Sequence, residues 1–208
     1  MDWGALLIKI GQTALALFVI IDPLGGLPVF ASLLRSMPPQ RQRQTVNMGV
    51  LVAVLILLLF ATVGMRMLGL FDVGLPELMI AGGVMLMIVG LNEVFGFLPE
   101  TSTYRENVGI VPMACPLLAG PGAIVTLMLA MKQTPPPAGY VVMLAGVALA
   151  MGASWLILRY THALIGVLGT RGSLVVAKLM GIVVTAIGAH FILRGVMDFW
   201  TQTQPPGS

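Results

Sequence analysis

The chain has 208 residues, of which 58% are hydrophobic and 9% are charged. Its mean hydropathy is +0.99, and because a soluble domain carries roughly 25% charged residues, this composition excludes a water-soluble globular protein. The formal net charge of +3 is concentrated at residues 35–43, where a positive anchor at the cytoplasmic face of a membrane explains it better than a nucleic-acid surface. We therefore expect the lipid bilayer as a partner and no nucleic acid.

Long apolar segments follow one another along the whole chain. Each could cross a bilayer as a helix of about 20 residues, and hydrocarbon cannot satisfy exposed backbone groups, so helices are favoured over open strands. The polar breaks between the segments are too short for a soluble catalytic domain, and the tail, residues 201–208, is expected to be disordered. We expect an all-α polytopic fold with about six spans, at about residues 5–34, 46–71, 76–98, 108–131, 138–168 and 174–200.

The basic residues predict the orientation of these spans. Lys and Arg are retained in short cytoplasmic loops. One side of a six-span chain receives Arg35, Arg41, Arg43, Arg105, Arg159, Arg171 and Lys178, whereas the other receives Lys9, Arg66, Lys132 and Arg194. Both termini are therefore expected outside the cytoplasm.

Helix-breaking residues recur in the first and fourth segments, and each set has the spacing Pro-x-x-x-x-Pro. These runs are Asp22-Pro23-Leu24-Gly25-Gly26-Leu27-Pro28 and Pro116-Leu117-Leu118-Ala119-Gly120-Pro121-Gly122. The third and sixth segments share a second pattern, in which two glycines seven positions apart are followed by a polar residue, Asn92 or His190. This order predicts a duplicated three-helix unit, residues 1–104 and 105–200. A three-span unit ends on the side opposite its start, so the second copy must be inverted, as in secondary transporters.

The broken helices suggest a binding site. Proline and glycine unwind a helix locally, and the two helix ends at a gap then present carbonyls with partial negative charge and N–H groups with partial positive charge. Such a gap suits a zwitterion such as an amino acid, although an ion pair or a peptide would also fit. The alternative is a simple kink whose backbone groups are satisfied by neighbouring helices.

Polar side chains within apolar segments are the other candidates. Asp22 could bind a substrate ammonium, Na⁺ or a coupling proton, because a carboxylate in hydrocarbon is costly; alternatively it caps the half-helix that follows. His190 could relay protons or bond a backbone carbonyl. Glu93, next to Asn92, is expected to extend toward the membrane interface. The candidate substrate-binding residues are Asp22, Gly25, Gly26, Gly120, Gly122, Asn92 and His190.

Three runs carry a family resemblance: Ile21-Asp22-Pro23-Leu24-Gly25, Ala81-Gly82-Gly83, and Pro116 through Ile124. They resemble the signatures of the MarC family of bacterial inner-membrane proteins, and the resemblance covers nearly the whole chain. It implies a six-span inner-membrane protein, so that termini outside the cytoplasm would be periplasmic, and some relatives are described as transporters of small neutral amino acids. Gly26, where relatives commonly have Asn, and His190, where they often have Gln, depart from the pattern.

The leading hypothesis is a secondary transporter or exporter of small neutral amino acids or similar metabolites. It would be coupled to H⁺ or Na⁺ and would need no other cofactor or metal. The alternative is a structural or regulatory membrane protein that transports nothing. A membrane-embedded enzyme is not expected, because the chain lacks His-Glu-x-x-His and Gly-x-Ser-x-Gly motifs, and because no paired acids are expected in facing spans. The sequence leaves the solute, the direction of transport and the oligomeric state open.

Overall fold

The computed structural model describes residues 3–34, 37–96, 118–134 and 136–203, and all regular structure within them is helical. This confirms the predicted all-α polytopic fold. Five of the described helices are long and apolar enough to cross a membrane, namely α1, α3, α4, α7 and α8. The helices are α1 (Trp3–Ile21), α2 (Leu27–Leu34), α3 (Pro39–Leu70), α4 (Leu75–Phe95), α6 (Pro121–Gln133), α7 (Ala138–Arg159) and α8 (Thr161–Thr203).

The predicted boundaries hold for the first half of the chain better than for the second. The first segment breaks between α1 and α2, where the sequence placed the break, and the third segment is α4. The fourth segment, predicted at residues 108–131, is described only from residue 118 onward. There, α6 has 13 residues, too few to cross a bilayer alone.

The boundary between the fifth and sixth segments was predicted in part: the kink at Gly169 lies where the sequence placed the break, but the fifth segment ends earlier than expected. Helix α7 ends at Arg159, the chain turns at Tyr160, and Thr161 already starts α8. The expected loop at residues 169–173 is helical except for a kink at Gly169, whose φ of 70° and ψ of 167° are accessible mainly to glycine. No proline or glycine marks the turn at Tyr160, so composition could not reveal it. The tail was expected to be disordered from residue 201, but α8 continues to Thr203. Residues 204–208 lie outside the described ranges.

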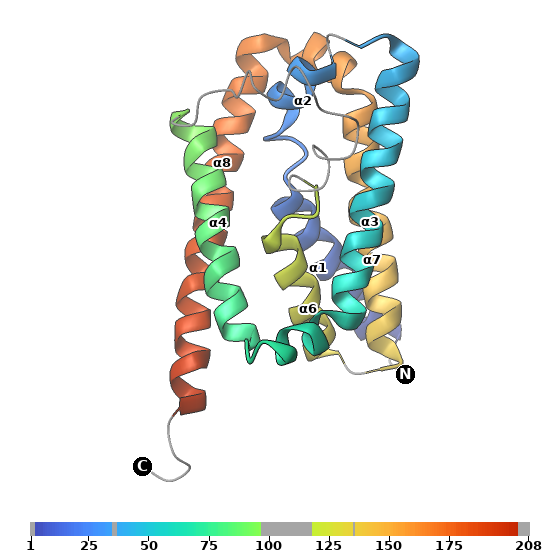
Figure 1. The fold of residues 1–208 in the computed structure, drawn as a ribbon. Helices are drawn as coiled ribbons and strands as arrows, with labels where there is room; N and C mark the ends of the chain where they lie inside the picture. Colours follow the sequence, from blue (N-terminus) through green and yellow to red (C-terminus); the bar gives the residue numbers. More distant parts are fainter. Residues whose placement is uncertain (1–2, 35–36, 97–117, 135, 204–208) are drawn as a thin grey trace.

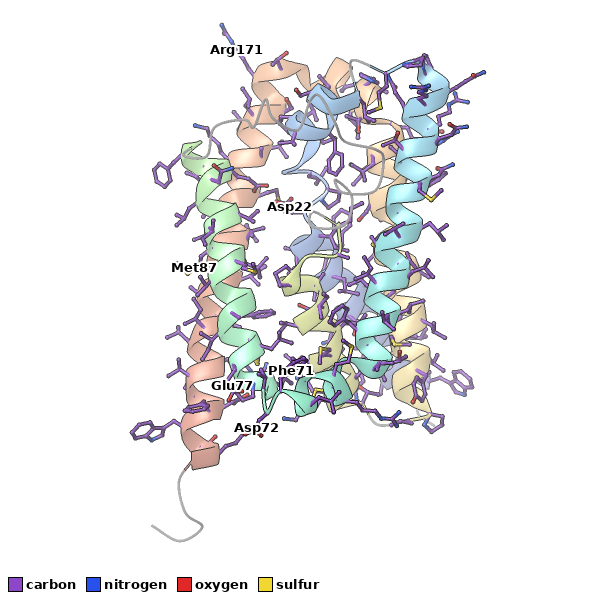
Figure 2. The ribbon with its side chains drawn as sticks, viewed as in Figure 1. Asp22, Phe71, Asp72, Glu77, Met87 and Arg171 are labelled. Carbon is purple, nitrogen blue, oxygen red and sulfur yellow. The ribbon has the colours of Figure 1, made fainter. Side chains whose placement is uncertain are left out.

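The helices form a bundle with the broken segments in the middle (Figure 1). Helices α4 and α8 lie along one side, α3 and α7 along the other, and α1 and α6 run between them. The start of α1 and the end of α8 lie at the same end of the bundle, and Arg171 lies at the opposite end (Figure 2). This arrangement agrees with the predicted separation of the termini from Arg171, but which end faces the cytoplasm stays a prediction.

Helix α6 joins two apolar cores. Its Ala123 and Leu127 pack with α1, α3 and α7, whereas its Val125 and Met128 pack with α4 and α8. The outer faces are apolar as well: along α3, side chains at intervals of four residues are more than half exposed, at Leu51, Leu55 and Leu59. Such a surface is suited to lipid contact, and it leaves the centre of the bundle as the place for buried polar groups.

Helices α4 and α8 are antiparallel and packed backbone to backbone through glycines. A Cβ atom at Gly90 would lie 2.5 Å from the Gly181 carbonyl oxygen, and one at Gly181 would lie 2.7 Å from the Gly90 carbonyl oxygen. These are the glycines whose shared spacing suggested a duplication. Such reciprocal contact is what an inverted repeat would produce, and the division of the chain into two repeats stays a prediction.

Candidate functional site

The first broken helix is a compact turn. Helix α1 ends at Ile21, and Asp22 adopts a left-handed conformation with φ of 47° while its N–H donates to the Phe18 carbonyl at 3.0 Å. The Gly26 N–H then donates to the Asp22 carbonyl at 3.1 Å, and α2 begins one residue later at Leu27. The break therefore lies where the sequence placed it, but the turn itself satisfies several of the backbone groups that we had expected to be free.

The carboxyl group of Asp22 has two different environments. Its Oδ1 accepts the Gly25 N–H at 2.8 Å, which is the local capping role that was one of the two sequence hypotheses. Its Oδ2 is buried and has no hydrogen-bond donor among the described residues. The whole side chain is only 7% exposed and lies within the bundle where α1 ends (Figure 2). Capping thus accounts for one oxygen and leaves the other available.

Glu93 supplies the second carboxyl group of the site. It lies in the last turn of α4, and its side chain is within hydrogen-bonding reach of the Asp22 side chain. Its Oε2 is also buried without a donor among the described residues. Two sequence-based expectations were therefore wrong: Glu93 does not extend to the interface, and facing segments do carry paired acids.

The position of Glu93 could have been recognised from its helix face. Gly83, Leu86 and Gly90 are buried, and Glu93 continues their spacing of three and four residues along α4. A Cβ atom at Gly181 of α8 would lie 2.8 Å from the Glu93 Cβ, so this face packs on α8. The expectation that Glu93 extends to the interface rested on its nearness to the end of the segment. The helix face on which a residue lies is a better guide to its surroundings.

The start of α6 lies against the end of α1. Leu118 and Ala119, just before α6, belong to the same buried cluster as Ile21, and Figure 1 shows the two helix ends meeting in the centre of the bundle. Gly120 is the N-cap of α6, and its carbonyl accepts the N–H groups of Ala123 and Ile124 at 3.0 and 3.2 Å. The earlier part of this second break, including Pro116, lies outside the described residues.

The remaining candidate substrate-binding residues differ in how close they lie to the Asp22 side chain. A Cβ atom at Gly25 would overlap the Asp22 carboxyl group, whereas one at Gly26 would lie 3.1 Å from the Phe30 ring. A Cβ atom at Gly122 would lie 2.7 Å from the Leu86 side chain, so Gly122 serves helix packing. Asn92 is half-buried beside Glu93. His190 is exposed on α8, outside the buried surroundings of Asp22.

Among the residues that the structure describes, no metal cluster accompanies the two carboxyl groups. In the described ranges, no group of three or more His, Cys, Asp or Glu side chains could hold a metal ion. Two carboxyl groups with unbonded oxygens have the chemistry to hold one small cation, such as a proton, Na⁺ or a protonated amine.

Comparison with known proteins places the chain in a family. A family model described as "MarC family integral membrane protein" matches residues 7–200. The chain belongs to the MarC family of integral membrane proteins. This confirms the resemblance that the sequence runs suggested.

Curated relatives span nearly the full length of this MarC family member. The UPF0056 inner membrane protein YhgN of Escherichia coli (strain K12) is 31% identical, over 90% of this chain and 96% of its own. A UPF0056 membrane protein of Methanocaldococcus jannaschii is 30% identical, over 87% of this chain and 92% of its own. One of Pyrococcus abyssi is also 30% identical, over 86% and 90% of the two chains. These names state a membrane location and no activity, and no solved structure is significantly similar to the chain.

Proposed function

We propose that this MarC family protein is a secondary transporter of small neutral amino acids or similar zwitterionic metabolites across the inner membrane, coupled to an ion or proton. The observation that carries the proposal is the buried Asp22 carboxyl group, which lies at a helix break in the centre of the bundle and keeps one oxygen without a donor among the described residues. A buried carboxylate is costly unless a cation or a proton compensates it. An ammonium group of a solute would do so.

The neighbouring helix end supplies the complementary charge. Helix α6 begins at Pro121, beside the end of α1, and a helix N-terminus carries partial positive charge that favours anions. A solute with an ammonium group near Asp22 could therefore direct its carboxylate toward the α6 N-terminus. The end of α1 and the start of α6 lie near each other in the centre of the bundle (Figure 1), which favours a small amino acid over a peptide.

The alternative function rests on a specific contact as well. The 2.8 Å bond from the Gly25 N–H to Asp22 Oδ1 is a structural role that needs no solute, and it fits a structural or regulatory membrane protein. The Asp22–Glu93 pair also removes one argument against a membrane-embedded enzyme, since paired acids can serve acid–base catalysis. The structural alternative does not account for the second Asp22 oxygen, which is left without a donor among the described residues.

Ligand binding by the purified protein tests the proposal. A solute that binds only the folded state raises its stability, by about 2.7 kcal/mol at a hundredfold excess over Kd. Thermal unfolding should therefore shift upward with a subset of small neutral amino acids, and Asp22→Asn should lose the shift while remaining folded, since Asn caps about as well as Asp. Asp72→Asn is the matched control, because Asp72 also has positive φ, of 55°, but is exposed. A folded wild-type protein that no amino acid, small peptide or cation stabilises would support the non-transporting alternative.

A further inference from the structure

The contact between Asp22 and Glu93 joins two groups that are both acceptors when ionised. Their carboxyl groups lie within hydrogen-bonding reach of each other, yet Asp22 Oδ2 and Glu93 Oε2 have no donor among the described residues. Two ionised carboxylates in contact repel each other, and neither can donate. A hydrogen bond between them requires a proton on one of them.

The described surroundings offer no other compensation for two negative charges. Asp22 is over nine-tenths buried, and apart from Glu93 the only described group that hydrogen-bonds its carboxyl is the Gly25 N–H. Among the described residues, Asp22 is the ionisable side chain in contact with the Glu93 carboxyl group. Lys178, three residues before the contact of Gly181 with Glu93, is exposed on α8 and forms no ion pair with Glu93 in the described structure.

We propose that Asp22 and Glu93 form a single cation site that holds one shared proton when the transporter is empty and exchanges it for the ammonium group of the solute. The exchange step rests on the proposed function, whereas the shared proton does not. When a solute R–NH₃⁺ enters, the hydrogen bond between the carboxyl groups breaks, the proton leaves to water, and both carboxylates accept N–H bonds from the ammonium group. No electrons are transferred.

The net charge of the site is the same with a proton bound and with an ammonium group bound, which explains why the exchange would couple proton movement to solute movement. With one shared proton, the pair carries a net charge of one negative unit. With both carboxylates ionised and one ammonium group bound, the pair and the ammonium again sum to one negative unit. Only the vacated pair would carry two adjacent negative charges, one on the buried Asp22 and one on the half-buried Glu93, which is the costly state. The pair therefore favours obligatory exchange of a proton for a solute across the membrane.

The shared proton is tested directly by infrared spectroscopy of the solute-free protein. At neutral pH the wild type should show the carbonyl stretch of a protonated carboxylic acid, shifted by D₂O. The double variant Asp22→Asn/Glu93→Gln should lose this band. Glu77→Gln is the matched control, because Glu77 is also on α4 and its Oε2 is also buried without a donor among the described residues; that variant should keep the band that the double variant loses.

Two results would overturn the shared proton. One is a wild-type spectrum in which the double variant removes no protonated-acid band. The other is loss of the band when Na⁺ replaces choline, which would make the pair a sodium site. If the double variant does not fold, Glu93→Gln alone serves, since the amide of Gln would donate to an ionised Asp22 and the band should vanish.

Calorimetry tests the exchange step separately. Solute binding measured in buffers with different ionisation enthalpies should release close to one proton per solute in the wild type and none in Glu93→Gln. Binding without proton release would overturn the exchange while leaving the transporter proposal intact. If no solute binds, the transporter proposal fails, and the infrared result still decides whether the two acids share a proton.

Discussion

Gly83 of α4 and Gly188 of α8 occupy each other's side-chain space. A Cβ atom at Gly83 would lie 2.6 Å from the Gly188 carbonyl oxygen, and one at Gly188 would lie 2.7 Å from the Gly83 carbonyl oxygen. Small residues allow this close approach, which lets membrane helices associate without a hydrophobic driving force. The same pair of helices holds Glu93 in place opposite Asp22, so this packing supports the candidate site.

Gly83→Ala should therefore destabilise the protein although it adds only a methyl group. The added carbon meets backbone, which cannot rotate away, and overpacking of this kind costs about 1–3 kcal/mol. Gly152→Ala is the control, because nothing lies within 4 Å of its Cβ position in α7, and we expect it to be neutral or slightly stabilising. Thermal unfolding in detergent measures both; equal midpoints would argue against the close α4–α8 contact.

Gly25→Ala and Gly26→Ala should differ although the two residues are adjacent. The alanine methyl at position 25 would overlap the Asp22 carboxyl group, so the side chain must turn away and give up its bond to the Gly25 N–H. We expect a loss of about 1–2 kcal/mol of stability and of any solute-induced thermal shift. At position 26 the methyl meets the Phe30 ring at 3.1 Å, which can move slightly. Similar behaviour of the two variants would contradict this geometry.

His190→Gln should leave solute binding unchanged. His190 was a sequence candidate for proton relay, but its side chain is exposed on α8. Glu93→Gln, by contrast, should weaken binding at least tenfold, since each tenfold step corresponds to about 1.4 kcal/mol and loss of a charge that contacts the solute exceeds this. Thermal-shift titrations of the two variants compare them, and a large effect of His190→Gln alone would require a different site.

Cys115 is the only cysteine in the sequence, so the orientation in the membrane can be tested with single cysteines in a Cys115→Ser background. Arg171 and Gln202 are both exposed, and the end of α8, which contains Gln202, lies at the end of the bundle opposite Arg171. From the distribution of Lys and Arg, a membrane-impermeant maleimide should label Gln202→Cys in intact cells and should label Arg171→Cys only after lysis. Labelling in the reverse order would place the termini in the cytoplasm.

The sequence predicted most of the fold because bilayer thickness and backbone hydrogen bonding leave few choices for apolar segments. It also located the first break, because the prolines and glycines around Asp22 strongly disfavour a continuous helix. It could not locate the turn at Tyr160, where no helix breaker stands. It missed the partner of Asp22 because residues 71 positions apart meet only through the packing of α4, and a glutamate near a segment end is usually interfacial.

The position of His190 shows a similar limit of sequence patterns. Its equivalence to Asn92 came from the shared glycine spacing, but the face of a helix that turns toward its neighbours depends on packing. The glycines of that pattern do meet at the α4–α8 contact, whereas the polar residue two places later follows a different direction around the helix. A shared spacing therefore predicted the helix contact better than it predicted the surroundings of Asp22.

Exchange of labelled solute in proteoliposomes tests the central claim most directly. Vesicles loaded with unlabelled alanine should accumulate labelled alanine, glycine or serine from outside when they contain the wild type or Asp72→Asn, and should fail to do so with Asp22→Asn of equal monodispersity in detergent. Exchange by Asp22→Asn at the wild-type rate, or no exchange of any small neutral amino acid by the wild type, would contradict a transport site at the Asp22 helix break.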